Sequence, residues 1–103
     1  MPSQDFKRSD RIADLIKVEI SKVLSTEVKD PRIQGITVLG VQLTPDMKKA
    51  DISISQSNSF NSLDPSDVRN GLENAKGFIR KKLSQNLNLR RTPEIFFKIE
   101  DLI

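Results

Sequence analysis

The residues of this chain best suited to chemistry are cations that have no acidic neighbours in the sequence. Between Glu73 and Glu94 there is no Asp or Glu, whereas Lys and Arg recur throughout. These cations are Lys76, Arg80, Lys81, Lys82, Arg90 and Arg91. Over the whole chain 14 acidic residues nearly balance 17 basic ones, so this segregation is more informative than the net charge of +3. Such a surface suits a polyanion, and the pattern favours nucleic acid.

Catalytic chemistry has few candidate residues. The sequence contains no His and no Cys, which removes the usual general base, disulfides and thiolate metal ligands. Gly35 and Gly40 do not have the spacing of a phosphate-binding loop or a dinucleotide fingerprint. The carboxylates of Asp64 and Asp67 are better explained as helix-start residues than as an acid–base pair. We therefore expect no enzyme, no catalytic residue, no metal site and no cofactor.

The cations must be positioned by helices in the interval 64–93. Asp64 is a good N-cap and Pro65 suits the first helical position. Gly is unfavourable inside a helix, so Gly77 predicts two helices separated by a sharp bend at Ala75-Lys76-Gly77. A loop with Arg90 and Arg91 should follow the second helix. The expected apolar stripe is Val68, Leu72, Ala75, Ile79, Leu83 and Leu87. Arg80 and Lys81 project away from it, which fits a binding face but also a merely solvated amphipathic helix.

The chain before this interval predicts one helix and a hairpin. Residues 1–8 resemble a flexible basic arm, and a helix should begin near Ser9 or Asp10. Its buried stripe is expected at Ile12, Leu15, Ile16, Ile20, Val23 and Leu24. A turn at residues 29–32 leads to a strand at 36–43, where Gly40 suggests a bulge.

A second strand should follow the turn at residues 44–48. In it, Ala50, Ile52 and Ile54 face inward, and Asp51, Ser53 and Ser55 face outward. A mobile loop is expected at 56–64 and a last strand at 95–99, with Phe96 on the outward face. The predicted order is therefore α–β–β–α–α–β in one domain of 103 residues. This α+β class has a three-stranded sheet with the helices packed on one face.

Bulk composition narrows the class of protein. Hydrophobic residues make up 36% and charged residues 30% of the chain, as in ordinary small soluble domains. The most apolar run, at 35–41, is far too short to cross a bilayer, and the first ten residues lack the apolar core of a signal peptide. We expect a cytoplasmic protein that does not bind a membrane.

Several short motifs, taken in order, resemble one known family. The predicted element order is that of a type II KH domain, but Ala75-Lys76-Gly77 stands where KH domains carry a Gly-x-x-Gly loop. This variant resembles the ribosome-binding factor A family. Further similarity lies in Lys29-Asp30-Pro31-Arg32, in the hairpin from Val41 to Ile54, and in the stretches 77–80 and 89–95.

The resemblance implies a non-catalytic assembly factor that binds the free 30S subunit and its 16S rRNA. It further implies a role in late 30S maturation and 16S rRNA 5′-end processing, notably in the cold, with maturation GTPases as additional candidate partners and a monomeric state. The expected RNA-binding residues are Lys76, Gly77, Arg80, Lys81, Arg90, Arg91, Arg32, Lys29, Arg8 and Arg11. Because aromatic residues make up only 5% of the chain, base stacking should contribute little. Two alternatives stay open: a general RNA-binding KH-like module, and a protein-interaction adaptor that uses the outer sheet face or Phe60 and Phe96.

Overall fold

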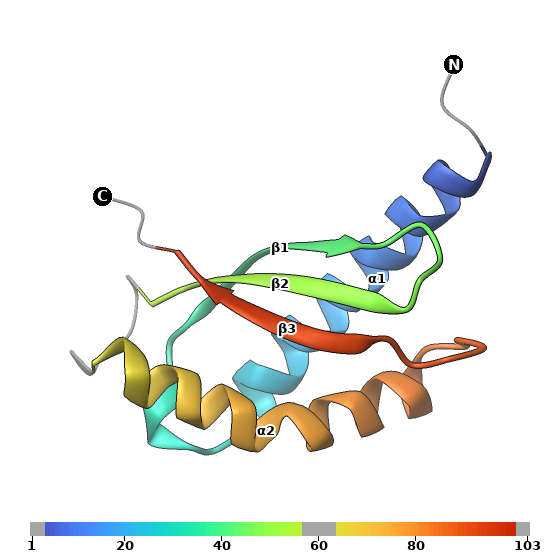
Figure 1. Ribbon diagram of the computed structural model, residues 1–103. Helices are drawn as coiled ribbons and strands as arrows, with labels where there is room; N and C mark the ends of the chain where they lie inside the picture. The colour runs from blue at the N-terminus through green and yellow to red at the C-terminus, as the bar shows by residue number, and fades with distance from the viewer. Residues whose placement is uncertain (1–3, 57–63, 101–103) are drawn as a thin grey trace.

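Two long helices and a three-stranded sheet form the chain in the computed structural model, which describes residues 4–56 and 64–100 (Figure 1). The elements in order are α1 (Gln4–Thr26), the short 3-10 helix η1 (Pro31–Ile33), β1 (Thr37–Leu43), β2 (Lys49–Ser55), α2 (Pro65–Asn86) and β3 (Glu94–Ile99). Figure 1 shows α1 passing behind the sheet and α2 lying alongside β3. The α+β arrangement predicted from the sequence, with a helical layer on one sheet, is confirmed.

Helix α1 is longer than the sequence suggests. It begins at Gln4, so the predicted start near Ser9 or Asp10 is wrong and the second half of the predicted flexible arm is helical. The predicted buried position of Leu15 is also wrong, because its side chain is 53% exposed while Ile16 and Ile20 are fully buried. Neighbouring helical residues lie about 100° apart, and α1 presents only the stripe containing Ile16 to the sheet.

The hairpin follows the sequence closely. Strands β1 and β2 pair antiparallel, and their register shifts between Val38 and Gly40, which confirms the predicted bulge. Ala50, Ile52 and Ile54 are fully buried, as predicted from the alternation of β2. Ser55 is an exception: the alternation places it outward, yet it is only 1% exposed. It is the last residue of β2, where the chain leaves the sheet and the alternation no longer determines burial.

Strand β3 lies parallel to β2, with Lys49 opposite Glu94 and Ile54 opposite Ile99. The backbone N–H of Glu94, the first residue of β3, donates at 2.8 Å to the carbonyl oxygen of Lys48, the residue just before β2. Parallel strands begin at the same edge of a sheet. The turn before β2 and the loop before β3 therefore lie side by side.

Helix α2 is continuous from Pro65 to Asn86, so the predicted break at Ala75-Lys76-Gly77 is wrong. Leu72, Ala75, Ile79 and Leu83 are all buried, and their spacings of three and four residues belong to a single helical stripe. A helical Gly costs about 1 kcal/mol relative to Ala, which burial of these side chains outweighs. The ribbon of α2 changes direction near its middle without losing helical structure (Figure 1).

The predicted start of α2, with Asp64 as its N-cap, is confirmed. The carboxylate of Asp64 accepts a hydrogen bond from the backbone N–H of Ser66 at 2.9 Å, and this contact lowers the pKa of Asp64. At the other end of α2, the amide of Asn86 donates to the carboxylate of Glu19 at 2.7 Å and ties α2 to α1. Most of the predicted mobile loop at 56–64 lies outside the described residues.

Candidate nucleic-acid interface

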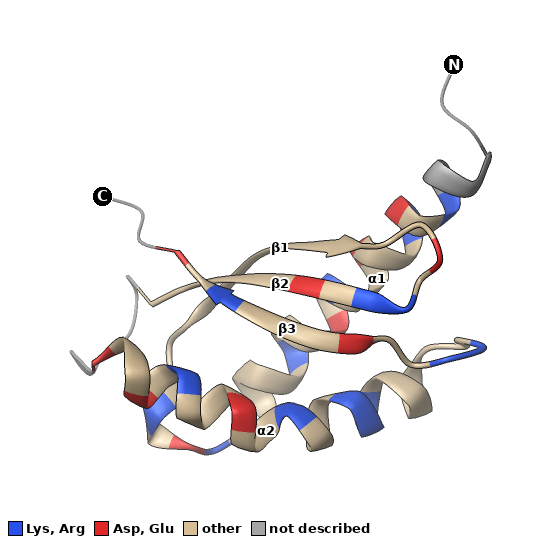
Figure 2. Cartoon of the chain, viewed as in Figure 1, with Lys and Arg blue, Asp and Glu red and all other residues tan. Residues whose placement is uncertain are grey.

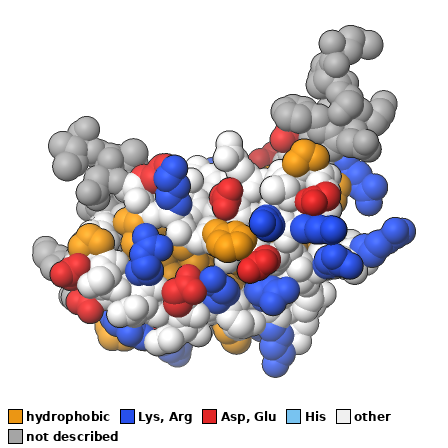
Figure 3. Space-filling model, in the orientation of Figure 1, with side chains coloured by type: hydrophobic (Ala, Val, Ile, Leu, Met, Phe, Trp, Pro, Cys, Tyr) orange, Lys and Arg blue, Asp and Glu red, His pale blue; other side chains and the backbone are white. Residues whose placement is uncertain are grey.

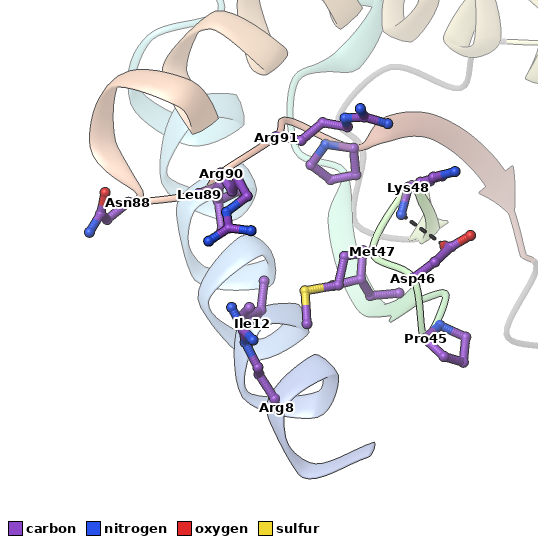
Figure 4. Close-up of a pocket in the computed structure, with 12 residues that line it drawn as sticks. Arg8, Ile12, Pro45, Asp46, Met47, Lys48, Asn88, Leu89, Arg90 and Arg91 are labelled. Atoms are coloured by element: carbon purple, nitrogen blue, oxygen red, sulfur yellow. Dashed lines mark hydrogen bonds between the residues drawn. The ribbon is translucent and has the colours of Figure 1, made fainter. Parts of the chain in front are cut away.

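One groove collects cations from three separate segments of the chain. Arg8 comes from α1, Lys48 from the turn between β1 and β2, and Arg90 and Arg91 from the loop between α2 and β3. The groove has a volume of about 660 Å³. In Figure 4, Arg8 and Arg90 lie on the α1 side, and Lys48 and Arg91 lie together on the opposite side. We call these four side chains the cationic rim.

The topology explains why the cationic rim forms. The parallel pairing of β2 and β3 brings the turn that holds Lys48 beside the loop that holds Arg90 and Arg91. The extra helical turns at the start of α1 then carry Arg8 to the same groove. Arg80 holds the loop in place, since its guanidinium donates to the carbonyl oxygens of Thr92 and Pro93, both at 3.3 Å. Arg80 thus stabilises the rim instead of lining it.

The rim cations are available to a ligand. Among the side chains of residues 8–56 and 64–100, no carboxylate forms an ion pair with Arg8, Lys48, Arg90 or Arg91, and all four residues are exposed. Figure 3 shows basic side chains gathering where the β1–β2 turn and the α2–β3 loop lie, with a few acidic ones among them.

One acidic residue, Asp46, also lines the groove. Its carboxylate accepts hydrogen bonds from the Thr44 hydroxyl at 2.6 Å and from the Lys48 backbone N–H at 3.0 Å. These contacts, above all that with Thr44, hold the pKa of Asp46 below its ordinary value. Asp46 therefore serves the turn that carries Lys48.

The second half of α2 is basic but partly neutralised. Figure 2 shows Lys and Arg there with no acidic residue after the middle of the helix. In the fold, however, Lys76 pairs with Glu73 at 2.9 Å and Lys82 pairs with Glu27 at 3.6 Å. The ammonium of Lys76 also lies 5.8 Å from the ring centre of Phe96. The stretch itself contains no acid, as the sequence shows, but Glu73 and Glu27 from outside it pair with two of its cations.

Gly77 and Lys81 are two further predicted RNA-binding residues on α2. Both are exposed, and a Cβ built on Gly77 would meet no atom within 4 Å. Neither the backbone of Gly77 nor its surroundings require a Gly. Lys29 and Arg11 are also exposed, but neither lines the groove. The structure thus divides the predicted RNA-binding residues: Arg8, Arg90 and Arg91 come together in the groove, whereas Lys76, Gly77, Lys81, Lys29 and Arg11 lie outside it.

The guanidinium of Arg32 stabilises the turn at η1. It donates to both carboxylate oxygens of Asp30, with the shortest contact at 2.7 Å, and Asp30 also caps η1 through the Arg32 backbone N–H. The side-chain hydrogen bond from Arg32 is the main cause of the lowered pKa of Asp30. A Cβ built on Gly71 would lie 2.8 Å from Cγ2 of Ile33 and 3.1 Å from Cβ of Arg32. This turn therefore packs directly against α2 at Gly71.

Sequence reasoning missed Lys48 and the apolar side chains that line the groove, those of Ile12, Leu43, Met47 and Leu89. Lys48 lies in a turn far along the chain from Arg90, and only the parallel register joins them. The predicted order of second strand, two helices and last strand contained that signal, since parallel strands joined by a helical crossover start at one edge of the sheet. Among the described residues there is no cluster of His, Cys, Asp and Glu that could hold a metal ion, and no helix is both long and apolar enough to span a bilayer.

Sequence comparison gives matches over most of the chain. Residues 8–103 match the family model described as ribosome-binding factor A. A protein of that name from Syntrophus aciditrophicus (strain SB) is 42% identical over 93 residues, which cover 90% of this chain and 74% of the relative.

Structure comparison gives the same fold. The crystal structure of ribosome-binding factor A from Thermus thermophilus matches with a TM-score of 0.77 at 19% identity, over 88% of this chain and 93% of that one. A homology model of the Thermus thermophilus factor, fitted into a cryo-EM map of a 30S–RbfA complex, matches with a TM-score of 0.58 at 22% identity, over 82% and 90% of the two chains. The KH-like α+β fold is thereby confirmed.

Proposed function

This chain belongs to the ribosome-binding factor A family, and from that premise we propose that it is a non-catalytic assembly factor that binds the free 30S subunit through 16S rRNA. The observation that carries the RNA part is the cationic rim. Its exposed guanidinium and ammonium groups come from three segments and have no carboxylate partner in the described chain. Cations held at fixed separations contact successive phosphates and release counterions, which gives affinity with little reading of sequence.

The 30S subunit is the partner that the comparisons favour. The Thermus thermophilus relative with the same fold was fitted into a map of its complex with 30S. By membership of the family, we propose that this protein acts in the cytoplasm as a monomer during late 30S maturation and 16S rRNA 5′-end processing, with a greater contribution in the cold. Maturation GTPases belong to the same proposal as further partners.

Co-sedimentation with purified free 30S subunits tests the proposal. The double variant Arg90→Glu and Arg91→Glu should bind about tenfold or more weakly than the wild type, since both groups are exposed rim cations. Both lie in a loop, so the thermal transition should change little. Arg80 is unsuitable for this purpose because its guanidinium holds that loop.

The matched control reverses two exposed cations of α1 outside the groove, Lys17→Glu and Lys22→Glu. It changes the net charge by the same amount and should sediment with 30S nearly as well as the wild type. Equal weakening by both double variants would mean that net charge alone attracts the protein. Wild-type sedimentation of the Arg90 and Arg91 variant would remove the cationic rim from the interface.

A further inference from the structure

The groove inside the cationic rim has an apolar floor. Ile12 of α1, Leu43 at the end of β1, Met47 of the turn and Leu89 of the loop all line it. Each is neither fully buried nor fully exposed, so each keeps apolar surface open to the groove. A site for phosphates alone needs no such floor, since phosphate contacts come from charged and polar groups.

Met47 is the least expected residue of this floor. Its φ is 61°, and it is the one described residue other than Gly with a positive φ. This left-handed conformation favours Gly and Asn and is unfavourable for a long side chain such as Met. In Figure 4 the Met47 side chain extends from the turn toward Ile12 on α1. The turn thus keeps an unfavourable residue whose thioether lies in the groove.

An apolar floor inside a cationic rim complements one particular chemistry. A nucleotide carries a flat, weakly polar base on a sugar with an anionic phosphate. Single-stranded RNA can turn its bases outward, whereas a duplex keeps them stacked and offers mainly phosphates and 2′-hydroxyls. The volume of about 660 Å³ lies within the range of roughly 300–1,000 Å³ that is usual for small-molecule-sized sites.

We propose that this groove binds one unpaired nucleotide of single-stranded RNA, with its base against Ile12, Met47 and Leu89 and its flanking phosphates on the cationic rim. This inference rests on the proposed function and adds a specificity to it: the surface distinguishes unpaired from paired RNA. The floor is aliphatic, so the base is held by apolar contact and dispersion without ring stacking, in keeping with the low aromatic content.

Methionine methyl NMR gives a direct test, because the chain has only two Met residues, Met1 and Met47. The full chain carrying ¹³C-methyl Met is titrated with a single-stranded RNA of about eight nucleotides, a length within the site sizes of compact RNA-binding folds. The ring current of a base in the groove should shift the Met47 methyl signal. A set of RNAs, each abasic at one successive position, should contain one member that binds without this shift. The duplex of the same sequence should also leave the signal nearly unchanged.

Affinity measurements add a protein variant to this comparison. Removing the critical base should weaken binding to the wild type by about five- to tenfold. In Met47→Asn the same base removal should matter less than about twofold, because the apolar contact is already absent. Asn suits a positive φ, so the Tm of this variant should be unchanged or higher. Leu15→Ser is the matched control, since it removes an exposed apolar side chain outside the groove and should respond to base removal as the wild type does.

The outcomes separate this inference from the proposed function. Equal affinity of the wild type for intact RNA and every abasic RNA, with an unshifted Met47 signal, overturns the nucleotide site while phosphate binding to 30S stands. Weaker 30S binding by Met47→Asn without any dependence on a base also overturns it and points to a ribosomal protein segment in the groove. Insensitivity of 30S binding to Arg90 and Arg91 overturns the proposed function itself.

Discussion

At the scale of single residues, the fold assigns different tasks to cations that look alike in the sequence. Arg32 is held by Asp30, and Arg80 is held by two backbone carbonyls. Arg90 and Arg91, in contrast, line the groove without an ion pair in the described chain. The sequence places all of these in one expected RNA-binding set, because charge and spacing do not reveal which partner the fold supplies.

The pair of Asp30 and Arg32 predicts a dependence of stability on pH. The folded-state pKa of Asp30 lies below its ordinary value of 3.8, chiefly because Arg32 donates to its carboxylate. The unfolded chain therefore binds this proton more readily than the folded one. The stability from this pair is complete above about pH 5 and is lost as the pH falls through 3.8 and on through the folded-state pKa.

Thermal unfolding of the wild type and Asp30→Asn between pH 2 and pH 7 measures this effect. At neutral pH the variant should be less stable than the wild type, and the difference should shrink as the pH falls. Asp46 and Asp64 also have lowered pKa values. Their contributions to the pH dependence of stability are the same in both proteins and cancel in the difference. A difference that stays constant down to the lowest pH would show that the carboxylate charge of Asp30 does not stabilise the fold.

At the scale of elements, local pattern predicts the features that a few neighbouring residues determine. The alternation in 50–54, the cap at Asp64 and the bulge near Gly40 were predictable from the sequence and are present. The predicted break at Gly77 is absent, because burial of the whole apolar stripe outweighs the cost of one helical Gly. The groove required the pairing of β2 with β3, which brings together residues distant in sequence.

Two Gly residues of α2 should respond oppositely to Ala. Gly77→Ala should stabilise the protein by up to about 1 kcal/mol, since Ala is the better helix former and its Cβ meets no atom within 4 Å. Gly71→Ala should destabilise it by about 1–3 kcal/mol, since the Cβ would lie 2.8 Å from Ile33 Cγ2. Denaturant titration compares the two variants.

The Gly77→Ala variant also tests whether RNA lies against α2 at Gly77. A helical Gly without a steric reason inside the protein leaves room for a partner to approach the backbone closely. Gly77→Ala should therefore bind 30S more weakly although it is more stable. Wild-type affinity in the stabilised Gly77→Ala protein would exclude this stretch from the contact, leaving the groove as the interface.

At the scale of the whole molecule, one end of the domain brings four cations from distant segments together. The start of α1, the β1–β2 turn and the α2–β3 loop meet there, whereas Lys76 and Lys82, which lie outside the groove, pair with carboxylates (Figure 2). The adaptor alternative is less well supported: Phe60 lies outside the described residues, and Phe96, although 40% exposed, lies against the Lys76 ammonium.

The salt dependence of 30S binding tests the central claim most directly, because only phosphate contacts release condensed counterions. If Arg8, Lys48, Arg90 and Arg91 each meet a phosphate, the slope of log K against log potassium concentration should be about −3 to −4. Arg91→Ala should flatten that slope by nearly one unit, whereas Lys76→Ala should change it less, because Glu73 already pairs with Lys76. A wild-type affinity that does not respond to potassium, or an Arg91→Ala slope equal to that of the wild type, would contradict the assignment of the cationic rim to RNA phosphates.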